Sequence, residues 1–215
     1  MQVTATTALA ASGSRAAKPQ QVLDAARTLF LRDGFSATSM DAVAKEAGVS
    51  KATVYAHYKS KEELFAGIIH AECTRSWPET LGGVDMEAID PIEKLREIAG
   101  RYVRFINGSW PISVLRTVAA EAKRSPELGR LFYESGPDRG RRAFAGLLAA
   151  ADAKGLLRIP DPLQATDTFF AMLRGDIHLR CLVGLPAPSE AELAAHAEAM
   201  TEMFLRLHRP ARESA

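Results

Sequence analysis

The stretch "GVSKATVYAHYKSKEEL", residues 48–64, gathers side chains suited to binding a charged partner. It places lysine, tyrosine, histidine and serine residues around two alanines, with few residues that could form a core. Lysine and tyrosine side chains can reach phosphates, and small side chains let a helix approach base edges closely. We therefore expect this stretch to be a surface presented to the major groove of DNA.

A short helix within this stretch would carry the contacts. Ser50 is expected to cap a helix over 51–57, and Gly48 to end the helix before it. At about 100° per residue, Val54 and Tyr58 share one inward face. The opposite side carries small residues rimmed by polar ones, namely Ala52, Thr53 and Ala56 beside Lys51, Tyr55 and His57. This arrangement favours a groove-entering helix.

Each of these residues also has an ordinary structural explanation. Tyr55 could be a half-buried packing residue, and His57 a plain surface residue. Lys45 and Glu46 are expected on a solvated face. Thr38 is expected to cap the second helix whatever the function, with or without a phosphate contact.

Short helices must position this surface. Pro19 can occupy the first turn of a helix over about 19–33, which Gly34 ends. Its apolar face consists of Val22, Ala25, Ala26, Leu29 and Phe30. A second helix ends at Gly48, and a fourth begins after Ser60, with Glu63 completing a capping box. Two helices joined by a short glycine-containing turn make a helix-turn-helix.

The segment Ala25–Ile69, "AARTLFLRDGFSATSMDAVAKEAGVSKATVYAHYKSKEELFAGII", resembles the TetR family of bacterial transcriptional regulators. The run G-V-S-K-x-T-hydrophobic-Y, followed by K-S-K-E-E-L-F, carries the resemblance. It implies an N-terminal helix-turn-helix head, an all-α C-terminal regulatory domain and a homodimer. By position it implies base contacts at Lys51, Ala52 and Ala56, and phosphate contacts at Thr38, Ser39, Thr53, Tyr55, His57 and Lys61. Asp41 stands where some relatives place a basic base-reader, and we expect it to act as a cap.

Composition and charge fit this organisation. The chain has 215 residues, of which 47% are hydrophobic, so it can bury a sizeable core. Its alanine- and leucine-rich stretches favour an all-α fold of about nine or ten helices. Residues 1–62 carry eight basic against five acidic residues, a net +3, and the remainder carries −2. We predict a disordered tail over 1–18, a DNA-binding domain over 19–65 and a regulatory domain over 66–210.

The last two helices, predicted over 162–183 and 189–207, carry apolar residues on more than one side. A helix that is apolar on two sides must bury both. We expect the second side to meet the same helices of another copy, forming a homodimer with two-fold symmetry. The alternative is one thick monomer core.

The regulatory domain also resembles the C-terminal domain of AefR-like members of the family, over about 121–186. Its candidate ligand-binding residues are chosen by type and place: Trp77, Phe105, Trp110, Phe132, Tyr133, Phe170, Arg174 and His178. Ordinary core or surface packing is the alternative for each. The expected ligand is a small, largely apolar molecule of unknown identity.

Catalytic and metal-binding patterns are not found in the sequence. The five histidines are scattered, and no phosphate loop, nucleophile elbow or Cys/His pairing is present. We therefore expect no enzymatic activity, no cofactor and no metal. No apolar run is long enough to cross a membrane, and Cys73 and Cys181 are expected to be reduced thiols of a cytoplasmic protein.

The sequence thus predicts a DNA-binding transcriptional regulator. The expected mechanism is a repressor that a small apolar ligand releases from a palindromic operator of double-stranded DNA. The alternative is a helical small-molecule-binding protein or an enzyme that does not bind DNA.

Overall fold

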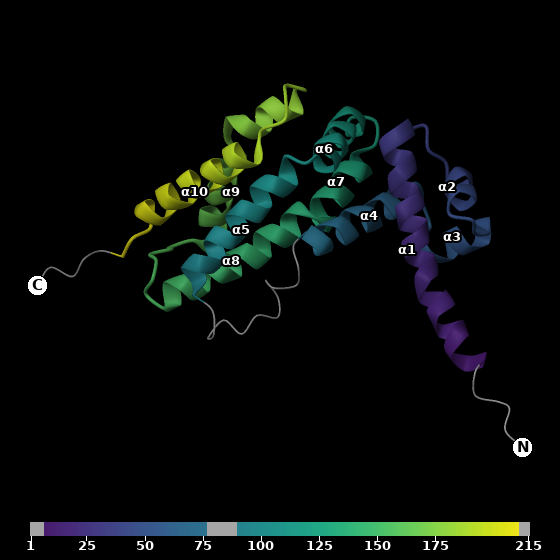
Figure 1. The fold of residues 1–215 in the computed structure, drawn as a ribbon, viewed down its shortest axis with the longest axis horizontal. Helices are drawn as coiled ribbons and strands as arrows, with labels where there is room; N and C mark the ends of the chain where they lie inside the picture. The colour runs from purple at the N-terminus through teal and green to yellow at the C-terminus, as the bar shows by residue number, and fades with distance from the viewer. Residues whose placement is uncertain (1–6, 77–89, 211–215) are drawn as a thin grey trace, which may run out of the picture. The chain divides into compact units, whose positions relative to one another are not determined.

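The computed structural model describes residues 7–76 and 90–210, which form helices joined by short connections (Figure 1). No strand occurs in these ranges, which confirms the predicted all-α fold. The helices are α1 (Thr7–Asp33), α2 (Met40–Glu46), α3 (Lys51–His57), α4 (Lys61–Ser76), α5 (Pro91–Ile106), α6 (Ser109–Glu121), α7 (Pro126–Ser135), α8 (Pro137–Ala153), α9 (Pro162–Leu182) and α10 (Glu190–Leu207). None of these helices is both long and apolar enough to span a bilayer.

The first helix begins earlier than the sequence pattern predicts. A start at Pro19 and a disordered tail over 1–18 were expected, but α1 runs from Thr7 and contains Pro19 in its interior. Residues 7–18 are therefore helical, and residues 1–6 lie outside the described part. The alanines before Pro19 favour helix, whereas Gly13 and the interior Pro19 oppose it, so residue types alone do not explain the extension.

The chain divides into two compact units. One comprises the residues up to Glu72 together with Thr117–Ser135, and the other comprises Cys73–Arg116 with the residues from Gly136 onward. The predicted boundary between residues 65 and 66 falls inside α4. The first unit, with α1 to α4, is called the head unit below, and the second, with α5 and α8 to α10, the bundle unit.

The head unit is built on apolar residues of α1 and α4. Phe30, Phe35 and Phe65 form a three-ring cluster with centroids 5.4–5.7 Å apart. All three rings are buried, as are the first-helix residues Val22, Ala26 and Leu29 predicted from the sequence. An ion pair between Arg27 and the buried Glu72, at 3.4 Å, adds a polar tie between α1 and α4.

The bundle unit packs α5, α8, α9 and α10 side by side (Figure 1). Its core holds Phe144 stacked on Phe169, with centroids 5.2 Å apart, and Phe204 of α10 lies 4.7 Å from Phe169. All three are fully buried. At one end, the backbone N–H of Arg158 donates to the carbonyl of His208, which ties the α8–α9 connection to the end of α10.

The sequence pattern does not predict a break in α9. Gly175 adopts φ 47° and ψ −161°, which splits α9 into two helical segments. A side chain here would be strained and would also meet His196 Cε1 at 2.9 Å. The Nε2 of His196 on α10 lies 3.0 Å from the carbonyl oxygen of Leu173, so α10 supplies a hydrogen-bond partner beside the break.

Candidate nucleic-acid interface

Helix α2 begins at a serine cap one residue later than predicted. Ser39 has an extended backbone, and its Oγ accepts from the N–H of Ala42 at 3.1 Å. The predicted cap at Thr38 is wrong because its side chain is buried and its hydroxyl donates back to the carbonyl of Gly34 at 2.8 Å. Ser39 is exposed at the start of α2, whereas Thr38 holds the preceding turn in shape.

The turn between α2 and α3 is fixed by Gly48. Gly48 has a φ of 64°, which favours glycine. Its N–H donates to the carbonyl of Lys45, and the N–H of Val49 donates to that of Ala44. These two bonds make a Schellman motif, which satisfies the last carbonyls of α2. The predicted stop at Gly48 is confirmed.

Helix α3 is capped and anchored as the sequence predicts. The Oγ of Ser50 accepts from the N–H of Thr53 at 3.1 Å. Val54 is fully buried, and Tyr58 is half-buried directly after the helix. The Tyr58 ring lies so close to Gly67 of α4 that a Cβ there would meet its Cε1 at 2.8 Å. Gly67 therefore sets how closely the end of α3 approaches α4, which the sequence analysis missed.

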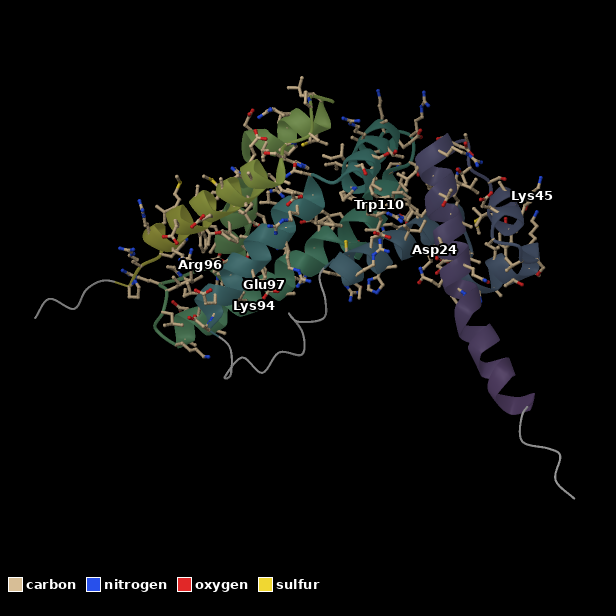
Figure 2. All side chains as sticks on the ribbon, viewed as in Figure 1. Asp24, Lys45, Lys94, Arg96, Glu97 and Trp110 are labelled. Carbon is tan, nitrogen blue, oxygen red and sulfur yellow. The ribbon has the colours of Figure 1, made fainter. Side chains whose placement is uncertain are left out.

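The outward side of α3 is a row of exposed residues. Lys51, Ala52, Tyr55, Ala56 and His57 are all exposed. Thr53 is half-buried, with its hydroxyl 2.8 Å from the hydroxyl of Ser50. Lys45 lies on α2 of the same unit and is also exposed (Figure 2). The structure thus leaves the predicted reading side of α3 accessible, while the DNA contacts themselves stay predictions.

Lys51 is not free on this surface, because it pairs with Asp41 of α2. Its Nζ lies 2.7 Å from Oδ1 and 3.0 Å from Oδ2 of Asp41. The hydrogen bond that Lys51 donates to the Asp41 carboxylate raises the pKa of Lys51, so its ammonium stays protonated. Asp41 does not cap α2, contrary to the expectation from the sequence, because Ser39 occupies that role.

Lys61, predicted to contact phosphate, is engaged within the head unit. Its Nζ donates to the carbonyls of Phe35 at 2.7 Å and Ser36 at 3.2 Å, and lies 4.5 Å from the Phe35 ring centroid. It therefore ties the start of α4 to the α1–α2 connection. Ser60 caps α4 through the N–H of Glu63, but the Glu63 carboxylate accepts from the N–H of Lys59 instead of closing the predicted capping box.

Two of the candidate ligand residues lie beside Tyr102 in the bundle unit. Phe170 is buried and stacks on the Tyr102 ring at 4.5 Å between centroids. Arg174 is exposed, and its Nη1 donates to the Tyr102 hydroxyl at 3.2 Å. Burial raises the pKa of Tyr102, so its hydroxyl remains protonated at neutral pH. This edge of α5 and α9 combines aromatic surface with one guanidinium.

His178 forms a buried polar pair with Asn107. The amide nitrogen of Asn107 donates to the carbonyl of Val103, so its Oδ1 faces His178 Nδ1 at 3.2 Å. The imidazole must therefore donate from Nδ1, which leaves Nε2 as an acceptor. Burial, with a smaller effect from the charge of Arg174, lowers the pKa of His178. The structure thus holds His178 neutral and in one tautomer.

The remaining candidate ligand residues are not shown to form one site. Trp110 is buried at the start of α6 (Figure 2), and Phe105 is half-buried on α5. Phe132 is half-buried and Tyr133 exposed on α7, which belongs to the head unit, and Trp77 lies outside the described residues. A groove of about 360 Å³ between α5 and α10 is lined instead by charged residues such as Arg96 and Glu97 (Figure 2).

The sequence matches two described families. Residues 22–68 match the bacterial regulatory proteins of the tetR family, and residues 93–210 match the C-terminal domain of AefR-like transcriptional repressors. The chain is 38% identical over 120 residues to the transcriptional regulator AcrR of Shigella flexneri, covering 54% of this chain and 48% of AcrR. The chain thus spans about half the length of that curated relative.

Solved structures match over most of the chain. The flavonoid-responsive regulator FrrA superimposes with a TM-score of 0.71 and 39% identity, covering 91% of this chain and 99% of FrrA. A TetR transcriptional regulator from Agrobacterium tumefaciens gives a TM-score of 0.73 and 26% identity, covering 90% of this chain and 96% of its own. These matches extend the likeness beyond the head to the helices of the bundle unit.

The substitution Gly67→Ala should lower the free energy of unfolding. Overpacking typically costs about 1–3 kcal/mol, whereas better helix propensity returns at most about 1 kcal/mol. Urea unfolding followed by circular dichroism would measure the difference. In a Tyr58→Leu background the same change should cost less, because the ring is gone. Gly146→Ala on α8, with nothing within 4 Å of the new Cβ, should be neutral or stabilising. An equal cost in both backgrounds would contradict the Tyr58–Gly67 contact.

The pKa of His178 also predicts a dependence of stability on pH. Because the folded pKa lies below the ordinary 6.5, the unfolded chain binds the proton more tightly, and stability falls as pH drops through 6.5. His178→Gln should therefore lose less stability than the wild type between pH 7.5 and 5.5 in urea titrations. His70→Gln makes the same substitution on the exposed side of α4, away from the His178–Asn107 pair, and serves as the control. Equal slopes for wild type and His178→Gln would contradict the assignment.

Proposed function

The chain belongs to the TetR family of bacterial transcriptional regulators, and we propose that it is a homodimeric repressor that a small apolar ligand releases from its operator. In this proposal the protein acts on DNA in the cytoplasm and performs no catalytic step. The observation that carries the proposal is the exposed side of α3, presented by a helix-turn-helix.

The dimensions and chemistry of α3 support entry into the major groove. An α-helix with its side chains is about 10–12 Å across, and the major groove is about 12 Å wide, so the seven-residue α3 can lie in it. Ala52 and Ala56 allow the backbone to come close to base edges, and their methyl groups can touch thymine methyls. Tyr55 and His57 stand at the rim, where phosphate oxygens lie. The proposed base contacts are Lys51, Ala52 and Ala56.

The proposed phosphate contacts differ in how accessible they are. Ser39, Tyr55 and His57 are exposed and need no rearrangement. Thr53 would have to share its hydroxyl with Ser50, and Thr38 would contribute chiefly through its backbone. The Lys61 ammonium already donates to two carbonyls of the α1–α2 connection, so only an N–H group that these carbonyls do not use could contact DNA.

A dimer is supported by the apolar surface that α9 and α10 leave exposed. Leu179 and Val183 at the end of α9 are 57% and 65% exposed, and Met203 and Leu207 of α10 are 51% and 66% exposed. Burying them against a second copy would remove this surface from water. Two heads are also required by the DNA, because successive major grooves of a palindromic site repeat about every 34 Å.

Ligand control is proposed for the bundle unit. FrrA, 39% identical over nearly the whole chain, is described as flavonoid-responsive, so a planar aromatic molecule is the first ligand class to test. In this proposal Phe170, Arg174 and His178 supply aromatic surface, a charge and an acceptor to such a molecule. Phe105 and Trp110 lie close in sequence to Asn107, the partner of His178. Full release needs about 5.5 kcal/mol of difference in ligand affinity between the two states.

Operator binding should depend on Tyr55. We expect the protein to bind DNA adjacent to its own gene in the presence of excess nonspecific duplex, with affinity falling steeply as salt rises. Tyr55→Ala should weaken this binding by roughly 5- to 150-fold, the range for a lost contact of about 1–3 kcal/mol. Leu31→Ala removes a side chain of the same 43% exposure from α1 and serves as the control. Fluorescence anisotropy would measure both, and equal losses would argue against a specific role for Tyr55.

Dimerisation should depend on the exposed end of α9. Leu179→Glu places a charge on the proposed interface and should shift the protein toward monomer in sedimentation-velocity runs, with a parallel loss of operator affinity. Leu156→Glu, at an exposed position after α8, provides a matched control and should leave the mass unchanged. A wild-type protein that sediments as a monomer at micromolar concentration would contradict the dimer.

A further inference from the structure

The ion pair between Asp41 and Lys51 joins the two helices of the helix-turn-helix on their exposed side. The Lys51 ammonium lies within 3.0 Å of both carboxylate oxygens of Asp41 and 5.9 Å from the centroid of the Tyr55 ring. The pair therefore lies on the surface proposed to face the bases.

The pair has little to do with holding the fold together. The side chains of Asp41 and Lys51 are 64% and 60% exposed, and exposed ion pairs contribute little to stability. Ser39 caps α2, and buried Val43 and Val54 anchor the two helices. The pair therefore matters chiefly for how a partner binds to this surface.

The carboxylate changes what Lys51 can do. A free lysine has a flexible four-carbon stem and a point charge that binds any phosphate in reach. Asp41 holds the ammonium on the base-facing side and cancels its attraction for the phosphate backbone. At least one of the three ammonium N–H groups remains for a base, because only two carboxylate oxygens face it.

The pair presents a donor and an acceptor about 3 Å apart, and this combination fits one base pair best. In the major groove a G·C pair offers the guanine O6 and N7 acceptors beside the cytosine N4 donor. Lysine is suited to the guanine acceptors, and aspartate to the cytosine amine. An A·T pair places the thymine O4, an acceptor, where the carboxylate would need the cytosine N4 donor, so the carboxylate would be repelled there.

We propose that Asp41 is a positioning residue for Lys51, and that together they read one G·C base pair in each half-site. The proposal rests on the DNA-binding function proposed above. In this proposal the acidic residue Asp41 lowers the overall affinity for DNA and raises the selectivity among base sequences.

The test compares full-length variants on a selected operator and on duplexes in which each half-site base pair is replaced symmetrically. For the wild type, replacing one G·C pair should reduce affinity by roughly 5- to 150-fold. In Asp41→Asn that reduction should fall below about threefold. The variant should also bind nonspecific duplex more tightly than the wild type does. Its plot of log K against log salt should have a slope that is more negative by about one. Asp41→Glu, which retains the carboxylate, should keep most of the base preference.

Two controls separate this role from a general charge effect. Glu46→Gln removes the same charge from an exposed site on α2, and should raise affinity for all duplexes alike while keeping the base preference. In a Lys51→Ala background, Asp41→Asn should no longer alter the base preference. Circular dichroism melting would verify that every variant is folded.

The outcomes distinguish this proposal from the function on which it rests. A wild type that selects no duplex would overturn both. A selective wild type whose base preferences survive Asp41→Asn, or survive Lys51→Ala, would overturn the pairing role alone and leave DNA binding intact. Loss of preference at the same G·C pair in both variants would support it.

Discussion

Helices α2 and α3 have seven residues each, and helices this short do not persist alone in water, where about 12–15 residues are needed. Their shape is imposed by packing and by hydrogen bonds at their ends. Val43 and Ala44 bury one side of α2, Val54 buries one side of α3, and Gly48 lets the chain turn between them. The surface offered to DNA exists only while these anchors hold.

Local chemistry in the head could be predicted well from the sequence. The Ser50 and Ser60 caps and the glycine stops at Gly34 and Gly48 depend on hydrogen bonds between residues close in sequence, which a pattern of residue types encodes. The wrong prediction of the α2 cap also concerns residues close in sequence, because Thr38 and Ser39 both carry a hydroxyl group that can cap a helix. Only the burial of Thr38 against the preceding turn decides between them.

Contacts between distant residues could not be predicted in this way. Lys61 binds carbonyls 25 and 26 positions earlier, and Asp41 meets Lys51 across the turn. The pattern of apolar residues placed the last two helices close to their observed bounds but could not reveal the break at Gly175. Residue type likewise could not separate core from site among the aromatic residues, since Phe170 is buried in a stack whereas Tyr133 is half exposed.

The alanines of α3 have a consequence for how such a regulator diverges. Ala52 and Ala56 are exposed and contribute nothing to the buried core, which depends on Val54 and its neighbours. Replacing them with larger polar residues would alter the side of α3 that is proposed to face the groove, without creating a cavity or removing a cap. In the proposed complex with DNA, the choice of target sequence and the stability of the fold therefore depend on different residues of the same short helix.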